Sequence, residues 1–319
     1  MNSINFSYFY KKKYKGGNIP QDIIYDFFFS AFDDCERTKF LYDRVKSNYK
    51  KWILFPNYQL KEIKIDYFDY DSFDEDSDIF IDFIDTLGIV KDSRICIDIT
   101  GFLRPHLIYF TILLHKKYKI AKIDFLYTEP NFYIKAENTT FSGAISESPR
   151  TIKGCSSNFS NTNFEEDLLI INAGYDDKLI SAITKDKSKV YNKYLILGFP
   201  SLQADMYQEN ILQINKSKDE IGNYKGKKFA PANDPFETAN CIKEIIIENP
   251  KHSNIYLSPL SSKPQSLGMM LFYIWYNADL PLNIIFPFSD TYIPKTAIGI
   301  NYTWVYTLEL PNDNFELKK

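Results

Sequence analysis

The sequence predicts an α/β protein built from two similar halves, each with a mainly parallel sheet. Short apolar runs alternate with helical patterns along the chain, which indicates strand–helix–strand crossovers. Two stretches, Asp98–Pro105 and Ser258–Pro264, share one form: a strand end, a small-residue loop, a basic residue and a proline that opens an apolar helix. Because other segments recur in the same order, we expect two Rossmann-like halves that arose by internal duplication and are related by a pseudo-two-fold axis.

Composition limits the classes of protein to which the chain can belong. It has 319 residues, of which 45% are hydrophobic and 25% charged, and a net charge of −3. That charge gives no electrostatic case for nucleic acid, so we do not expect direct nucleic-acid binding. No apolar run is long enough to span a bilayer and there is no signal peptide, so we expect no membrane association. Four scattered cysteines without a CxxC motif favour a reducing, cytoplasmic setting, and the abundance of Ile, Asn and Lys is typical of a bacterial AT-rich genome.

The first half is expected to cover residues 23–148, after a polar amino-terminal arm formed by residues 1–22. Asp33 or Asp34 is placed to cap the helix that follows the first strand. The acidic stretch Asp66–Asp78 is interpreted as a solvated loop, with a divalent-metal cluster as the alternative. The expected strands are Ile23–Ala31, Trp52–Phe55, Ile95–Thr100 and Ile123–Tyr127, and the expected helices are Cys35–Ser47, Ile79–Leu87 and one that begins at Arg104.

The second half is expected to cover residues 168–310, after a linker of residues 149–167 that is rich in Ser, Asn, Thr and Gly. Residues 311–319 are expected to form a polar tail. Pro200–Asn215 has no counterpart in the first half, and Lys225–Lys228 is interpreted as a solvated basic loop. The expected strands are Leu168–Ala173, Tyr194–Gly198, Ile255–Leu257, Leu282–Pro287 and the β-rich Ile298–Leu310, and the expected helices are Lys178–Thr184, Phe236–Glu248 and one that begins at Lys263.

Four matches in the same order indicate the duplication. The matched pairs are Ser30–Asp34 with Ala173–Asp177 (173 − 30 = 143), Phe55 with Phe199 (199 − 55 = 144), Arg104 with Lys263 (263 − 104 = 159) and Tyr127 with Phe286 (286 − 127 = 159). The alternative is that any doubly wound fold reuses strand–loop–helix units and is therefore faintly repetitive.

The helices that begin at Arg104 and Lys263 are apolar nearly all round, so we expect them to pack on each other and their loops to converge on one cleft. Backbone N–H groups at a helix start attract anions, Arg104 can hold two phosphate oxygens and Lys263 adds a point charge. We therefore expect a small phosphorylated ligand there; the alternative is that both are ordinary first-turn residues. The expected ligand-binding residues are Asp98, Thr100, Gly101, Arg104, Ser258, Ser261, Ser262 and Lys263. No catalytic residue, metal ligand or cofactor is assigned.

The two segments SPLSSKPQSLG and DITGFLRP, in this arrangement, resemble the CARF and SAVED sensor domains of bacterial antiviral systems over about residues 25–305. The resemblance implies a regulatory subunit whose ligand is a nucleotide-type messenger, with a cyclic oligonucleotide as one candidate. It also implies a separate effector protein, because no effector domain is recognisable in this chain. CARF loops often carry a small-Gly-Gly-Thr-Lys type of sequence, whereas SSKP has no glycine here and the first copy has Gly101 with Arg104.

Two other classes stay open. A nucleotide- or nucleoside-processing enzyme would use the same cleft with Asp98 or Asp33 as acid or base, although GxGxxG, GxxxxGK[ST], GxSxG and HExxH motifs are all missing. A non-catalytic scaffold subunit of a multi-protein complex is suggested by the 17% aromatic content. A basic cleft favours the sensor, a deep pocket with a perturbed carboxylate favours the enzyme, and an exposed patch of Tyr and Phe favours the scaffold.

Overall fold

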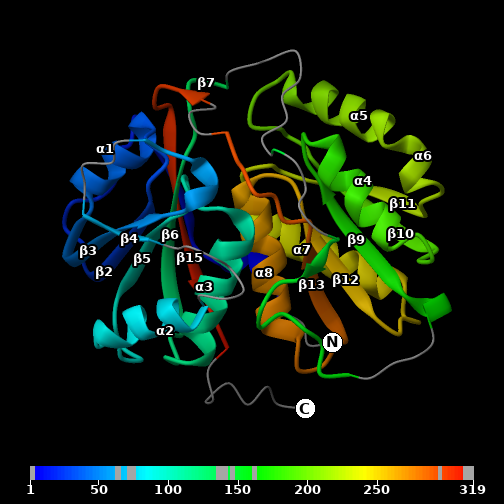
Figure 1. Ribbon diagram of the computed structural model, residues 1–319, viewed down its shortest axis with the longest axis horizontal. Coiled ribbons are helices and arrows are strands. Elements are labelled where there is room, and N and C mark those ends of the chain that lie inside the picture. Colours follow the sequence, from blue (N-terminus) through cyan, green and yellow to red (C-terminus); the bar gives the residue numbers. More distant parts are fainter. Residues whose placement is uncertain are drawn as a thin grey trace. The chain divides into compact units, whose positions relative to one another are not determined.

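The computed structural model describes residues 4–61, 66–69, 77–133, 143, 148–159, 164–293 and 297–311 (Figure 1). The chain is an α/β protein with two large, mostly parallel sheets in two compact units. We call them the N-unit, with described residues among 9–133 and 291–311, and the C-unit, with described residues among 4–8 and 143–290. Each unit is described by itself.

The N-unit is built on a sheet in which seven strands are described, in the order β1-β15-β6-β5-β2-β3-β4. The strands from β6 to β4 are parallel, whereas β15 is antiparallel to both β6 and β1. The elements are β1 (Lys11–Lys15), β2 (Ile24–Ala31), α1 (Glu36–Arg44), β3 (Lys46–Leu54), β4 (Tyr67–Asp69), α2 (Ser77–Thr86), β5 (Ile95–Asp98), α3 (Arg104–Lys116), β6 (Lys122–Thr128), β7 (Phe132–Tyr133), β14 (Ala297–Ile298) and β15 (Tyr302–Glu309), with a 3₁₀ turn at Pro56–Tyr58.

The C-unit is built on a sheet in which six strands are described, in the order β11-β10-β9-β12-β13-β8. All neighbouring strands are parallel except β8, which is antiparallel to β13. The elements are β8 (Arg150–Thr151), β9 (Leu168–Ala173), α4 (Asp177–Asp186), β10 (Asn192–Gly198), α5 (Met206–Lys216), α6 (Lys218–Ile221), β11 (Gly226–Ala230), α7 (Pro235–Glu248), β12 (Ile255–Pro259), α8 (Lys263–Tyr276) and β13 (Leu282–Phe286), with 3₁₀ turns at Phe6–Tyr8 and Phe164–Glu166.

The five parallel strands follow one order in both sheets. Numbered along the chain within each unit, the parallel strands lie side by side in the order 3-2-1-4-5: β4-β3-β2-β5-β6 in the N-unit and β11-β10-β9-β12-β13 in the C-unit. An antiparallel strand borders the fifth in both sheets, β15 in the N-unit and β8 in the C-unit. This is the doubly wound order, with the switch point between the first and fourth strands. The strand register differs between the units. In the N-unit Ser30 of β2 pairs with Asp98 of β5, and the sequence offsets of 143 and 159 carry this pair to Ala173 and Leu257. In the C-unit, however, Leu257 pairs with Ile170. The shared order is therefore a property of both units, while the duplication and the two-fold relation stay predictions.

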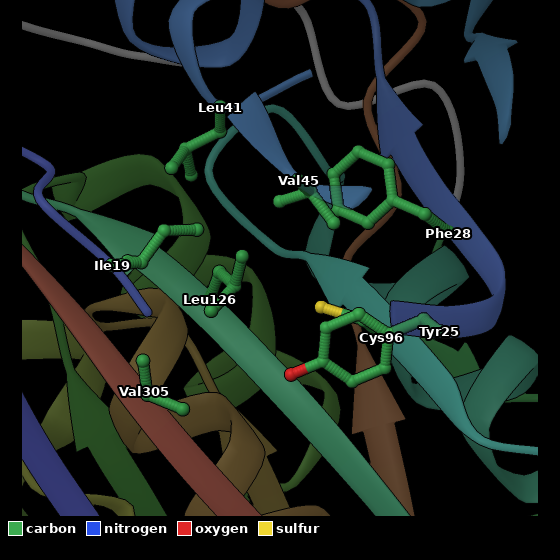
Figure 2. Packing of buried hydrophobic residues seen from close by; sticks show 8 residues of the cluster. All are labelled: Ile19, Tyr25, Phe28, Leu41, Val45, Cys96, Leu126 and Val305. Atoms are coloured by element: carbon green, nitrogen blue, oxygen red, sulfur yellow. The ribbon is translucent and has the colours of Figure 1, made fainter. Parts of the chain in front are cut away.

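Both faces of the N-unit sheet are packed with aromatic and aliphatic side chains. On one face Phe28 lies in a cluster with Leu41 and Val45, contributed by α1 and the residue after it (Figure 2). On the other face Phe29 meets Phe110 of α3 edge to face, with ring centroids 5.0 Å apart. Strand β2 can bury both faces because its FFF run supplies apolar side chains in both directions of the pleat.

The predicted starts of the two apolar helices are confirmed. Helix α3 begins at Arg104 and helix α8 at Lys263, each with proline at its second position, where no intrahelical N–H bond is lost. Every residue of α8 after Lys263 is buried, and α7 in the same unit covers part of it, since a Cβ on Gly268 would overlap the Pro235 carbonyl oxygen. The expected packing of α3 on α8 stays a prediction.

Three expected domain boundaries are corrected. The arm of residues 1–22 contains β1, and Phe6 is fully buried against Tyr276 of the C-unit. The first part of the expected linker, residues 149–159, is not a free linker, since it contributes β8 and the fully buried Ile152 and Cys155. The range expected for the second half, 168–310, ends in β15, which lies in the N-unit sheet (red in Figure 1), because its backbone pairs with β6 and β1.

Two local expectations are also corrected. The helix predicted for Cys35–Ser47 ends at Arg44, because pairing with β2 draws Lys46 into β3. The basic loop at Lys225–Lys228 contains most of an edge strand, β11, in which Lys227 is exposed and Lys228 partly accessible while the backbone pairs with β10. Most of the acidic stretch, residues 70–76, and the tail after residue 311 lie outside the described residues.

Candidate functional site

In the N-unit, Asp98 ends strand β5 at the switch point of the sheet. One carboxylate oxygen accepts a hydrogen bond from the Ser30 hydroxyl at 2.9 Å, and the other accepts one from the Thr100 N–H at 2.9 Å. The side chain is fully buried, and this desolvation raises the pKa of Asp98 to about 6 although the two hydrogen bonds act in the opposite direction. Asp98 therefore ties β5 to β2 and shapes the loop that follows.

The rest of this loop is fixed by hydrogen bonds to its neighbours. The Thr100 hydroxyl accepts from the Thr128 N–H at 3.1 Å, and the Tyr58 hydroxyl donates to the Gly101 carbonyl at 2.7 Å. Burial raises the pKa of Tyr58 well above its ordinary value, so the phenol stays a neutral donor. A Cβ on Gly101 would overlap the Ala31 carbonyl oxygen, so the ends of β2 and β5 approach as closely as a glycine permits.

Helix α3 then begins at Arg104 without a side-chain cap. Its N-cap residue is Leu103, which has no side-chain hydrogen bond to the first turn. Among the four predicted residues of this loop, Arg104 is the one that is partly accessible, while Asp98, Thr100 and Gly101 are buried. Arg104 is therefore the accessible part of this loop, and its charge at a helix start favours an anion.

In the C-unit, the equivalent loop is organised by Gln265 in the first turn of α8. Ser261 donates to the Gln265 side-chain oxygen at 2.7 Å, and Ser262 caps the helix by accepting from the Gln265 N–H at 3.2 Å. Ser262 also donates to the Ala232 carbonyl, and the Gln265 amide donates to the Ala230 carbonyl at 3.1 Å. The predicted serines thus fold the loop, and Lys263, which is partly accessible, starts the helix.

Two buried polar side chains near this loop have no hydrogen-bond partner among the residues that the structure describes. Asn172 of β9 is fully buried, and neither its amide nitrogen nor its carbonyl oxygen is satisfied; the Ser258 hydroxyl is in the same state. Asn172 of β9 pairs with Ile196 of β10, so both side chains lie on the same face of the sheet, as does position 198 two residues further along β10. A Cβ added at Gly198 would lie 3.4 Å from the side-chain oxygen of Gln265 in α8. The Asn172 amide is therefore on the sheet face that α8 covers, at the carboxyl end of the central strand.

The sequence reasoning missed Asn172, Gln265 and Tyr58. Asn172 left a signal, because it is the single polar residue in the run Leu168–Ala173, where an unpaired amide is costly. Gln265 had the capping spacing, three residues after Ser262. No local pattern connects Tyr58 with Gly101, since 43 residues separate them.

The structure places the eight predicted residues in two groups of four, one in each unit. Six of them are buried and most make hydrogen bonds within their own loop, while Arg104 and Lys263 are partly accessible. The two groups share one chemistry: a helix start at the carboxyl edge of a parallel sheet, with a basic residue at its first position. Such a site can hold an oxyanion, but the fully enclosed Asp98 is not placed to exchange a proton with a substrate.

The acidic pairs make local hydrogen bonds at the two helix starts, but the expected cap is confirmed only at α4; the N-cap residue of α1 is Cys35, which makes no side-chain cap hydrogen bond, so Asp33 does not cap that helix. An Asp176 side-chain oxygen accepts from the Lys178 N–H at 3.2 Å at the start of α4, and Asp33 accepts from the Cys35 N–H at 3.1 Å before α1. Asp33 also accepts from the Thr38 hydroxyl at 2.8 Å. These hydrogen bonds account for the recurring pair without an active site.

Within the described part of the chain, no helix combines the length and the apolar character needed to cross a membrane. Among the same residues, no three His, Cys, Asp or Glu side chains are grouped as metal ligands would be. No family model, curated protein or solved structure matches this chain.

Proposed function

We propose that this chain is a ligand-sensing or regulatory protein that binds a phosphorylated nucleotide-type molecule at the loops preceding α3 and α8. It works in the bacterial cytoplasm as part of a defence system and signals to a separate effector chain. The observation that carries the proposal is the recurrence of one device: in both doubly wound sheets, the fourth strand leads to a helix that begins with a basic residue and proline. The assignment to a defence system is supported only by the CARF/SAVED resemblance.

Two features at these loops support an anionic ligand. Arg104 and Lys263 are partly accessible, while the polar side chains beside them are mostly engaged in fixing the loops. A preformed loop lowers the entropic cost of binding, because few side chains have to be ordered by the ligand. The unpartnered amide of Asn172 supports a polar occupant near the start of α8.

The test is thermal stability against linear and cyclic mono-, di- and oligonucleotides, with Arg104→Ala and Lys263→Ala in parallel. A ligand at 100 times its dissociation constant adds about 2.7 kcal/mol to the free energy of unfolding. Losing a hydrogen bond to a charged group costs about 1.5–3 kcal/mol, so each variant is expected to weaken binding roughly tenfold to hundredfold. Lys61→Ala and Lys251→Ala, which change accessible lysines elsewhere in the two units, are the matched controls.

Chromatography of the bound ligand after incubation separates a sensor from an enzyme. An unchanged ligand is expected, since Asp98 and Asp33 are buried and hydrogen-bonded. Conversion of the ligand by wild type but not by Asp98→Asn would instead support the enzyme. If no nucleotide in the panel raises the free energy of unfolding of the folded protein, the proposal is wrong.

A second candidate, a scaffold subunit of a complex, is favoured by an aromatic patch on the C-unit. Phe199 and Phe229 are about half exposed and both contact Tyr207, with ring centroids 5.2–6.4 Å apart. Sedimentation of wild type against Phe199→Ser/Phe229→Ser tests whether this patch drives association. Identical sedimentation at every concentration would argue against self-association through the patch.

A further inference from the structure

The N-unit contains a cavity of about 610 Å³ that is separate from the loops discussed above. Its lining includes Tyr25, Lys46, Ile95 and Lys122, each at the first or second position of a strand from β2 to β6. The cavity therefore lies at the amino edge of the sheet, opposite the carboxyl edge where Asp98 ends β5. Its volume is within the range of about 300–1,000 Å³ typical of small-molecule sites.

The apolar floor of the cavity is the cluster in Figure 2. Ile19, Val45, Leu126 and Val305 belong both to this cluster and to the lining. Register places Leu126 opposite Val305 and Asp124 opposite Thr307, so these four side chains share one face of β6 and β15. The floor thus joins an apolar surface to a polar group at its edge.

That polar group is the partly accessible carboxylate of Asp124. One oxygen accepts from the Tyr25 hydroxyl at 2.9 Å, and the other accepts from the Thr307 hydroxyl at 2.5 Å. Burial raises the pKa of Tyr25, which keeps its phenol a neutral donor. A carboxylate has about four lone-pair positions, so two acceptor positions are left for a donor on a ligand.

The rings of Tyr14 in β1 and of Tyr10, the residue before β1, form one wall. Tyr10 and Tyr14 line the cavity, and the two-residue period of the strand puts both on the same side, with Lys12 between them. The Lys12 ammonium lies 5.2 Å from the centre of the Tyr14 ring. These rings offer flat surfaces to a planar group, and the nearby cation favours negative charge.

The mouth of the cavity carries more positive than negative charge. Lys46, Lys91, Arg94 and Lys122 are exposed and make no ion pair with any described residue. Asp92 and Glu309 are the acidic side chains at the same mouth. The cavity therefore has the Asp124 carboxylate in its interior and an excess of cationic side chains at its mouth.

We propose that this cavity binds a small planar anion that carries a hydrogen-bond donor at the end away from its charge. The donor contacts Asp124, the ring lies against Tyr10 and Tyr14, and the anionic group faces Lys91, Arg94 and Lys122. A nucleoside monophosphate and an aminoaryl carboxylate share this chemistry. The site is independent of the loops before α3 and α8 and does not rest on the function proposed for them.

Titration calorimetry with four probes tests the assignment and identifies the source of the ligand. AMP and 4-aminobenzoate contain both the donor and the anion, adenosine lacks the anion, and inorganic phosphate lacks the ring. Binding of AMP or of 4-aminobenzoate, at least tenfold tighter than that of adenosine and phosphate, is the expected result. Failure of both complete probes to bind, or binding of phosphate as tight as that of AMP, would overturn the proposal.

Variants of the mouth and wall test the location. Lys91→Ala/Arg94→Ala and Tyr14→Ala are each expected to weaken binding about tenfold or more, and added salt should weaken binding to wild type more than to the first variant. Lys61→Ala/Lys251→Ala, which also removes two positive charges from exposed positions, is the charge-matched control. Arg104→Ala should leave the affinity unchanged; if it abolishes binding while Lys91→Ala/Arg94→Ala does not, the ligand lies at α3 and the proposal fails.

Discussion

Asp98 and Asn172 are both fully buried polar residues near a switch point, but their situations differ. Asp98 has hydrogen bonds to both oxygens and still has a pKa raised to about 6, whereas the Asn172 amide has no partner within the described parts of the chain. Burial without full compensation costs free energy, so each residue destabilises its unit relative to a well-matched alternative. Both therefore make predictions about stability.

For Asp98 the prediction concerns pH. Its folded-state pKa of about 6 lies above the ordinary value of 3.8, so between these values the folded state holds more protons than the unfolded state. The free energy of unfolding should therefore fall as pH rises from about 4 to about 6, by on the order of 1–3 kcal/mol from this residue. Asp98→Asn should lack this component. Urea denaturation of both proteins from pH 4 to pH 8 measures the difference, and parallel pH profiles would contradict it.

For Asn172 the prediction concerns a replacement of similar size. Asn172→Leu removes two unsatisfied polar atoms and should raise the free energy of unfolding by about 1–2 kcal/mol. Asn277→Leu is the control, because the Asn277 amide donates to the Tyr273 carbonyl at 2.9 Å and its loss should not stabilise. Denaturant titration measures both variants. A destabilised Asn172→Leu protein would mean that the amide is satisfied in solution.

At the scale of elements, the two units solve one packing problem with glycines at different places. In the N-unit Gly101, in the loop after the fourth strand, meets the Ala31 carbonyl at the end of the first strand. In the C-unit Gly174, after the first strand, meets the Leu260 carbonyl in the loop after the fourth. The two pairs obey the offsets 174 − 31 = 143 and 260 − 101 = 159 found in the sequence. The close backbone approach at the switch point is thus common to both units. The glycine that permits it lies in the loop after the fourth strand in the N-unit and after the first strand in the C-unit.

Adding a methyl group at either glycine should therefore be costly. Gly101→Ala and Gly174→Ala are each expected to lower the free energy of unfolding by about 2–4 kcal/mol, because the new Cβ would overlap a backbone carbonyl. Gly88→Ala is the control: no described atom lies within 4 Å of a Cβ added there, so it should lose only about 1–2 kcal/mol, through its positive φ. Thermal or urea unfolding ranks the three variants. A cost at Gly101 or Gly174 no larger than at Gly88 would show that the loops move apart easily.

Elements were predictable where the local pattern alone determines them. The apolar runs of β5 and β9 and the starts of α3 and α8 follow from hydrophobicity and from a basic residue before proline. Strand β11 was missed because the three lysines in Lys225–Lys228 are typical of a solvated loop, whereas Lys227 and Lys228 remain accessible in an edge strand whose backbone pairs with β10. The loops before α3 and α8 could be found along the chain, but several hydrogen bonds that fix the N-unit loop come from residues distant in the sequence, namely Ser30, Tyr58 and Thr128.

At the scale of the whole molecule, the chain builds its units in alternation. Residues 4–8 join the C-unit, where Ser7 donates to Glu237 at 2.7 Å, and the next residues start the N-unit. After the C-unit is complete, the chain returns to the N-unit and inserts β15 between β1 and β6. Sequence periodicity identified Ile298–Leu310 as β-rich, but we assigned this segment to the wrong half. The pattern of a strand predicts its conformation and does not predict the strands with which it pairs, here β1 and β6.

The insertion of β15 predicts unequal effects of truncation. A chain that ends at Asp290 should lose hydrogen-exchange protection in the N-unit, since β1 and β6 lose their common neighbour, while β9, β10 and β12 of the C-unit keep theirs. A chain that ends at Pro311 retains β15 and is the control. Exchange measured by mass spectrometry reports both units in one experiment. Equal protection of the N-unit in the two chains would show that β15 is dispensable.

The late position of β15 also has a consequence during synthesis. Strand β6 ends at Thr128 and β15 begins at Tyr302, so 302 − 128 = 174 residues separate neighbours in the sheet. At about 5–20 residues per second, a ribosome needs roughly 9–35 s to bridge that gap. Throughout that interval the nascent N-unit presents the edge of β6 unpaired, a surface that other chains can add to and that chaperones bind. The C-unit sheet lacks this delay, because its described strands, β8 to β13, are consecutive in the chain. The C-unit sheet can therefore be completed before the N-unit sheet, although most of the C-unit is synthesised later.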